Sequence, residues 1–209
     1  MNRRLPDALD RALDRATREG PARRAVVVGA SAGGPAALQQ LLPGLDPALD
    51  AAVVVVVHVG PDGPDLLPSL LDRGSALPVV LATERRPLVP GVVHFAPSGY
   101  HLEVERDRRF SLSADARVCY SRPSIDVLFT SAAAAYGESL AGVVLSGASS
   151  DGAEGLGTIR DLGGLALVQT PTEAEIDTMP AAALARAGAD LCAPVTELAQ
   201  RINAFGRRG

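Results

Sequence analysis

The sequence predicts an α/β fold, in which a predominantly parallel sheet carries helices on both faces and a small antiparallel hairpin excursion interrupts the alternation. Apolar runs of strand length alternate with amphipathic runs of helix length, as in successive βαβ units. The run 51–57 is apolar throughout and ends in five consecutive valines, which is typical of a strand buried on both faces. Apolar residues make up 47% of the chain and aromatic residues only 3%, which suits small-residue helices packed on such a sheet.

The elements can be placed along the chain in order. Leu5, Leu9 and Leu13 recur every four residues before Gly20-Pro21, so 4–19 is predicted to be an amphipathic helix. We expect 1–22 to be an N-terminal helix or linker and 23–209 to be a single domain. Strands are predicted at 24–29, 52–58, 78–82, 91–96, 100–105, 109–113, 141–146 and 164–169, with hairpins within about 91–113. Helices are predicted at 34–42, 65–71, 124–136, 153–162, 178–187 and 196–205.

Composition argues against several classes of function. The formal net charge of -4 offers no general attraction to nucleic acid. Cys119 and Cys192 lie far apart without metal-ligand spacing, and no secretory signal or membrane-spanning run is present, so a cytoplasmic protein is expected. No cluster of His, Cys and carboxylate residues has ligand spacing either, and we expect neither a metal nor an organic cofactor.

The first apolar run ends in Gly29-Ala30-Ser31-Ala32-Gly33, which fits the G-x-S-x-G spacing of a nucleophile on a sharp strand-to-helix turn. Ser31 is therefore a candidate nucleophile, and the amides of Ala32 and Gly33 are candidates for holding an oxyanion. The alternative is a glycine-rich turn that packs a helix on the sheet or cradles a phosphate. A dinucleotide fingerprint requires glycine where Ser31 stands, and no P-loop lysine follows.

Two further strand ends carry side chains that a serine nucleophile needs. His58 follows the polyvaline run and Asp151 follows the run 141–146, and the carboxyl ends of parallel strands share one edge of a sheet. A serine hydroxyl needs a base, and that base needs an acceptor to fix its tautomer. In the alternative interpretation, His58 is a structural imidazole and Asp151 is the N-cap of the helix beginning at 153. His94, within a predicted strand, and His101, after a turn, fit the role of base less well.

Taken as a set, these segments resemble the catalytic domain of the chemotaxis protein-glutamate methylesterases, the CheB family. The likeness extends from about Arg24 to Ile202 through runs such as VVVGASAGGPAAL, VVVVVH, LVPGVVHFAPSGYHLEVE, SRPSIDVLFTSAAAAYG, GVVLSGASSDGAEGL, GGLALVQTP and EAEIDTMPAAALARAGAD. The resemblance implies that Ser31 is the nucleophile, His58 the base and Asp151 the orienting carboxylate. It further implies hydrolysis of glutamate γ-methyl esters, often with glutamine deamidation, on the helical region of chemoreceptors.

The chain also departs from the family pattern. Val57 stands where the family usually has Gln and Ala148 where it has Met. An acidic residue that is usual near Leu81 is missing, and another that is usual after Gln169 is replaced by Thr170. We place Ala148, Ser149 and Met179 on the substrate-binding side with the 147–150 loop, and Arg122–Asp126 is retained as a bend before a helix. The departures leave open a receptor-binding module with weak catalysis, or a small-molecule esterase or amidase.

Many family members carry an N-terminal receiver domain, whereas only the predicted helix precedes the first strand here. We therefore expect an esterase that acts constitutively or answers to a separate response regulator.

Overall fold

The structure is a computed structural model, and it describes residues 9, 12, 20–58 and 66–207. Seven strands form one sheet in the order β3-β4-β2-β1-β7-β8-β9, and every neighbouring pair runs parallel. The strands are β1 (Ala25–Ala30), β2 (Ala52–Val57), β3 (Val79–Leu81), β4 (Val93–Phe95), β7 (Leu140–Val144), β8 (Leu165–Gln169) and β9 (Leu191–Ala193). The predicted α/β fold class is confirmed.

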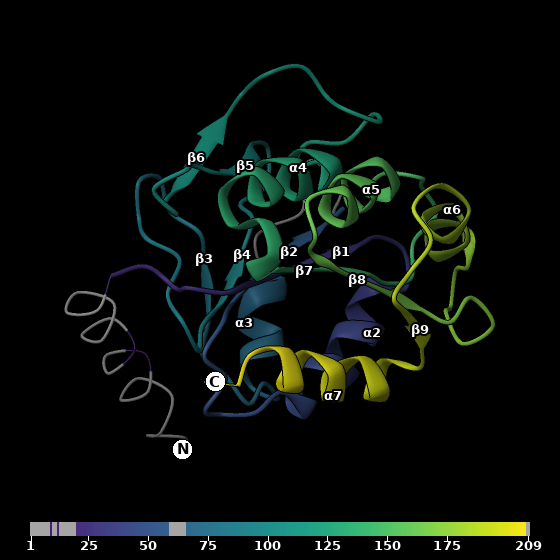
Figure 1. Cartoon of the computed structure of the whole chain (residues 1–209), viewed down its shortest axis with the longest axis horizontal. Coiled ribbons are helices and arrows are strands. Elements are labelled where there is room, and N and C mark those ends of the chain that lie inside the picture. The colour runs from purple at the N-terminus through teal and green to yellow at the C-terminus, as the bar shows by residue number, and fades with distance from the viewer. Residues whose placement is uncertain (1–8, 10–11, 13–19, 59–65, 208–209) are drawn as a thin grey trace.

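Helices cover both faces of this sheet (Figure 1). On one face lie α2 (Gly34–Leu41), α3 (Leu67–Asp72) and α7 (Val195–Phe205), and on the other α4 (Ile125–Tyr136), α5 (Ala153–Asp161) and α6 (Thr178–Arg186). Short 3-10 helices follow α2 and α4 at Leu42–Gly44 and Gly137–Ser139. Alternate residues of β1 serve the two cores: Val26 and Val28 pack on the α2 and α7 side, while Ala25 and Val27 pack on the α4 and α5 side. This explains why every residue of β1 and β2 is buried.

The antiparallel excursion is smaller than expected. Only β5 (His101–Val104) and β6 (Phe110–Ser113) pair antiparallel, as a two-stranded sheet that lies next to α4. The predicted strand at 91–96 instead forms β4, which lies in the parallel sheet between β2 and β3. The turn residues on both sides of this segment had led to the prediction of a hairpin strand, although its buried sequence Val93-His94-Phe95 suits an interior strand. Strand β9 was not predicted, because its three residues are too few to show a periodicity.

The predicted helix at 4–19 lies outside the described residues, except for Leu9 and Ala12. These two residues are helical and pack against Val89 and Val92, beside the β3 and β4 end of the sheet. None of the helices in the described part of the chain has the length and apolarity that a bilayer-spanning segment needs.

Candidate active site

The carboxyl ends of β1, β2 and β7 meet at the point where the strand order reverses. The chain runs from β1 to β2 on one side of β1, while β7 pairs with β1 on the other side, and ligands bind at such switch points in open α/β sheets. Ala30 is in register with Val57, so Ser31 and His58 leave adjacent strands at the same level. The N–H of His58 donates to the carbonyl of Ala30 at 3.0 Å, and the N–H of Ser31 donates to the carbonyl of Ser146 after β7, also at 3.0 Å.

His58 and Asp151 are directly paired. Nε2 of His58 lies 2.8 Å from Oδ2 of Asp151; the His58 side chain is 12% exposed and the Asp151 side chain is fully buried. Because the carboxylate accepts a hydrogen bond from the N–H at Nε2, the proton of the neutral ring stays on Nε2 and Nδ1 is left as the basic nitrogen. The arrangement supplies a base with a fixed tautomer one strand away from the hydroxyl of Ser31.

The Asp151 carboxylate is held by the first turn of α4. It accepts hydrogen bonds from the hydroxyl of Ser124 (2.9 Å) and from the N–H groups of Ile125 (2.8 Å) and Asp126 (2.9 Å). Burial acts to raise the pKa of Asp151, but the hydrogen bonds from His58, Asp126 and Ile125 outweigh it and the pKa is lowered. Asp151 therefore stays ionised at neutral pH, as a partner of an imidazolium must.

The alternative role of Asp151 as N-cap of the following helix is wrong. Gly152 occupies the N-cap position of α5, and the Asp151 side chain turns to the N-terminus of α4 instead. The first amides of α5 are satisfied by Asp126, whose Oδ1 accepts from Gly152 (2.9 Å) and Gly155 (2.7 Å). Burial, with a contribution from the nearby charge of Asp151, raises the pKa of Asp126 to about 6 despite these amide bonds.

Sequence reasoning interpreted Arg122–Asp126 as a bend that is structural or helps to shape the cleft, and it did not identify Ser124 and Asp126 as residues that hold the site. Ser124 is the N-cap of α4, where its hydroxyl also accepts from the N–H of Val127. The local signal was a serine two residues before an acidic residue at a helix start. That signal marks a cap, but it cannot reveal that a distant carboxylate shares the same helix end.

The two glycines that bracket Ser31 have separate structural causes. A Cβ on Gly29 would lie 2.4 Å from Cγ2 of Ile125, so this glycine lets the first turn of α4 approach β1 closely. Gly33 has φ 76°, in the left-handed region, and caps α2; a Cβ there would lie 2.5 Å from Oγ of Ser146. The G-x-S-x-G spacing thus reflects packing against α4 and a left-handed turn.

The remaining predicted substrate-side residues fall on two loops. Within the described residues, the N–H groups of Ala32 and Gly33 take part in no hydrogen bond, which leaves them available to an oxyanion. Ala148 is exposed, whereas Ser149 accepts the N–H of Asp151 at 3.0 Å and so shapes the turn. Met179 is buried, with its thioether against Gly147. Met179 therefore packs against the 147–150 loop at Gly147.

The other two histidines are bonded to groups other than Ser31 and Asp151. His94 is buried in β4, accepts the N–H of Val89 at 3.2 Å, and has a pKa lowered to about 4 because burial disfavours its charged form. His101 is buried behind Ser124: its Nδ1 accepts the N–H of Ser124 at 3.2 Å and its Nε2 lies 3.0 Å from the carbonyl of Ala116. Both rings are structural by their contacts.

One group of described side chains has ligand atoms close enough to share an ion. Single atoms of Cys119, Asp126 and Asp151 lie within 4.8 Å of one another. Both oxygens of Asp151 and Oδ1 of Asp126 already accept hydrogen bonds, so an ion would have to displace donors that hold α4 and α5. We do not assign a metal to this group.

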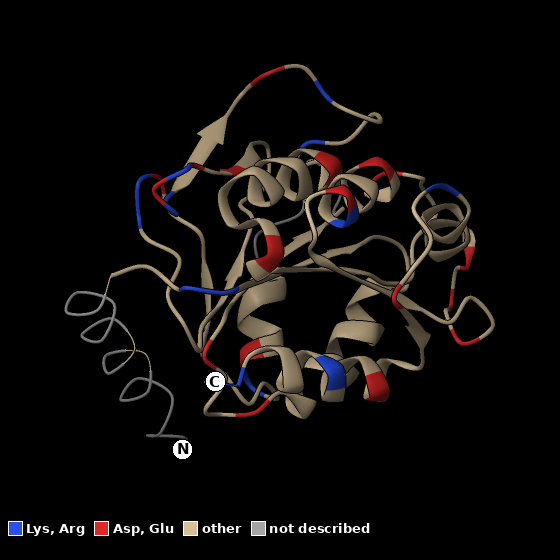
Figure 2. Cartoon of the chain, viewed as in Figure 1, with Lys and Arg blue, Asp and Glu red and all other residues tan. Residues whose placement is uncertain are grey.

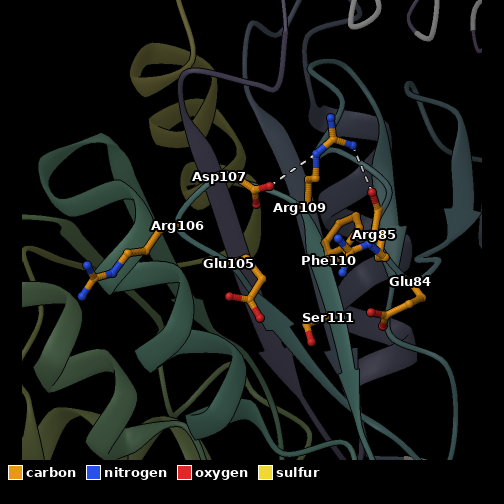
Figure 3. A pocket seen from close by; sticks show the side chains of 8 residues that line it. All are labelled: Glu84, Arg85, Glu105, Arg106, Asp107, Arg109, Phe110 and Ser111. Carbon is orange, nitrogen blue, oxygen red and sulfur yellow. Dashed lines mark hydrogen bonds and ion pairs between the residues drawn. The ribbon is translucent and has the colours of Figure 1, made fainter.

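A hollow at the β5–β6 hairpin is a different kind of surface. It is lined by Glu84, Arg85, Glu105, Arg106, Asp107, Arg109, Phe110 and Ser111 (Figure 3). Arg109 lies 3.4 Å from Asp107 and donates to the carbonyl of Arg85 at 3.0 Å. Charges of both signs meet here, and none of the three strand-end residues contributes to it.

Comparison with known proteins decides the family. The model of the CheB methylesterase family matches residues 26–202. The chain belongs to the CheB methylesterase family. The crystal structure of the Thermotoga maritima CheB methylesterase catalytic domain superposes with a TM-score of 0.83 at 28% sequence identity, covering 87% of this chain and 98% of that one.

Curated relatives agree with this assignment. A Leptospira interrogans relative, whose name gives it as a protein-glutamate methylesterase/protein-glutamine glutaminase, is 40% identical over 176 residues, or 84% of this chain and 91% of the relative. The Anaeromyxobacter dehalogenans protein-glutamate methylesterase/protein-glutamine glutaminase 3 is 41% identical over 189 residues, or 90% of this chain but 55% of that protein. The chain therefore spans nearly all of the first relative and about half of the second.

Proposed function

We propose that this protein hydrolyses γ-methyl esters of glutamate, and deamidates glutamine, in chemoreceptor proteins, with Ser31 as nucleophile, His58 as base and Asp151 as its orienting carboxylate. The observation that carries the proposal is the 2.8 Å pair of His58 and Asp151 one strand from Ser31. The printed activity of the Anaeromyxobacter relative names the reaction class. We place the reaction in the cytoplasm, on the helical region of the receptor.

The chemistry follows from the positions of the three groups. Ser31 Oγ attacks the ester carbonyl while Nδ1 of His58 accepts its proton, and the Asp151 carboxylate stabilises the imidazolium. The tetrahedral oxyanion is held by the N–H groups of Ala32 and Gly33. His58 then protonates the departing methanol, or ammonia when the substrate is glutamine, and activates the water that cleaves the acyl-serine.

Methanol release from a methylated receptor fragment tests the proposal. We expect Ser31→Ala to lose about three or more orders of magnitude in turnover with little change in stability, because the hydroxyl makes the bond and packs little. Ser131→Ala is the matched control: its hydroxyl bonds within α4 and to the N–H of Val104. A serine-directed fluorophosphonate should label Ser31 in the wild type.

The outcomes separate the rival functions. Labelling without methanol release from any receptor fragment, but with hydrolysis of a small aryl ester, would indicate a small-molecule esterase. A folded protein that binds the fragment and is not labelled would be a receptor-binding module. Either result would overturn the proposed activity.

A further inference from the structure

A cavity of about 210 Å³ opens beside His58. Its walls are His58, Ser98, Gly99, Arg117, Tyr120, Ser121, Arg122 and Pro123, so most of it is formed by the loop between β6 and α4. A water in the liquid takes up about 30 Å³, so the cavity has room for a side chain the size of glutamate. It lies beside the proposed base, where a residue near the scissile ester would be.

The charge of this cavity is one-sided. Among the described residues, two arginines line it and no aspartate or glutamate does, in contrast to the hollow in Figure 3, where Glu84, Glu105 and Asp107 share the surface with arginines. Figure 2 shows basic segments along the loop between β6 and α4, together with an acidic segment closer to β6. An anionic group entering here would meet guanidinium groups with no competing carboxylate in the described lining.

Arg122 is anchored yet incompletely bonded. Its Nη1 donates to the carbonyls of Ala114 (2.7 Å) and Asp115 (2.8 Å), which holds the guanidinium against its own loop. Its Nε is buried and has no hydrogen-bond partner among the described residues. Buried donors are nearly always paired, so this guanidinium keeps hydrogen-bonding capacity that the described residues do not use. A carboxylate suits a guanidinium edge best, because two parallel N–H···O bonds can form.

We propose that this cavity is a carboxylate subsite, in which Arg122 and Arg117 bind an acidic side chain of the substrate helix close to the ester that Ser31 attacks. The inference rests on the proposed function and adds a substrate preference to it. The chain carries a net charge of -4, so its overall field does not attract acidic substrates and the preference must come from these local cations. Tyr120, 95% exposed at the rim, offers an aromatic surface to the same helix.

Matched helical peptides test the subsite. Each carries one γ-methyl glutamate and, three or four residues before or after it, either Glu or Met. Met is uncharged, unbranched and cannot be deamidated. We expect Glu in at least one register to raise kcat/KM about tenfold, equivalent to about 1.4 kcal/mol. The gain should appear mainly in KM, because the carboxylate is bound equally in the ground and transition states.

Arginine variants locate the preference. In Arg122→Gln and Arg117→Gln the Glu-over-Met ratio should fall toward one, and in Arg106→Gln it should persist. Arg106 is exposed in the turn after β5, and its side chain points away from its neighbours (Figure 3). If Arg122→Gln does not fold, Arg117→Gln decides the question. Equal kcat/KM for every peptide pair, or a ratio that survives in both cavity variants, would overturn the subsite.

A binding measurement keeps the subsite separate from the chemistry. Unesterified Glu and Met peptides are titrated against Ser31→Ala and followed by fluorescence anisotropy. Tighter binding of the Glu peptide, lost in Ser31→Ala/Arg122→Gln, supports the subsite even if the wild type releases no methanol. Equal binding of the two peptides would sink it even if methanol release is normal.

Discussion

The carboxylates of Asp126 and Asp151 are exchanged between the N-termini of α4 and α5: Asp126 of α4 binds the start of α5, and Asp151, before α5, binds the start of α4. Asp126, in the first turn of α4, accepts the N–H groups of Gly152 and Gly155 at the start of α5. Asp151, which precedes the N-cap residue of α5, accepts the N–H groups of Ile125 and Asp126 at the start of α4. Two helix N-termini thus face two carboxylates, and the partial positive charge of both helix ends favours the negative charges. These exchanged hydrogen bonds hold the starts of α4 and α5 together around Asp151, the hydrogen-bond partner of His58.

The exchange predicts an effect of pH on Asp126→Asn. The pKa of Asp126 is raised to about 6 from an ordinary 3.8, so the folded protein binds this proton more tightly than the unfolded chain does. This proton contributes its whole share to the free energy of unfolding below about pH 3.8, and the contribution is lost as the pH rises through about 6. Asparagine keeps an acceptor for the two glycine amides and cannot ionise.

Asp126→Asn should therefore gain stability relative to the wild type between pH 5 and pH 7.5, measured by urea unfolding at both values. Asp161→Asn, an exposed carboxylate at the end of α5, is the control and should show no such gain. A stability difference between Asp126→Asn and wild type that is the same at both pH values would contradict this account.

Ser124 links helix capping to the site. Its hydroxyl donates to Asp151 and accepts from Val127, so Ser124→Ala should lower the free energy of unfolding by about 1 kcal/mol and lower kcat as Asp151 loses one donor. Ser131→Ala removes a part-buried hydroxyl from the same helix and should lower stability without lowering kcat. Equal kcat in the two variants, measured by methanol release, would show that Ser124 serves the fold alone.

The sequence predicted most of the sheet because the polyvaline run and the strand at 140–144 are long, apolar and bounded by turn residues. Ser31, His58 and Asp151 were predicted as site residues from the same runs, because Ser31 and His58 directly follow an apolar run and Asp151 lies in the loop after the run 141–146. The donors to Asp151 were not found, because the start of α4 is distant from Asp151 in the chain and is brought to it by tertiary packing, including that of Ile125 on Gly29 and Gly152. Strand β4 was assigned to a hairpin because the pattern of a three-residue strand does not specify its partner.

The contact between β1 and α4 predicts the effect of a single methyl group. Gly29→Ala would place Cβ 2.4 Å from Cγ2 of Ile125, so α4 must move outward with the amides that hold Asp151. We expect a loss of about 1–3 kcal/mol in stability and a fall in kcat. Gly74→Ala, where a Cβ meets nothing within 4 Å, should change neither. Thermal unfolding and methanol release measure both, and an unchanged Gly29→Ala would contradict the close packing.

The buried His94 predicts that the free energy of unfolding changes with pH in the direction opposite to the Asp126 effect. Its pKa is lowered to about 4 from 6.5 by burial, so the unfolded chain binds this proton more tightly and stability is lost as the pH falls from about 6.5 toward 4. His94→Gln keeps an acceptor for the N–H of Val89 but does not titrate. It should be less stable than the wild type at pH 7.5, because the ring contact with Phe110 is lost, yet decline less between pH 7.5 and pH 5.

The two buried titrations can be separated because their slopes oppose each other over the same pH range. As the pH falls from 7.5 to 5, the His94 proton lowers the free energy of unfolding and the Asp126 proton raises it. Replacing His94 therefore removes a loss of stability, and replacing Asp126 removes a gain. In the double variant Asp126→Asn/His94→Gln, the two changes in slope should add, because His94 in β4 and Asp126 at the start of α4 share no hydrogen-bond partner. A double variant whose slope departs from that sum would mean that the two protons are coupled through the sheet.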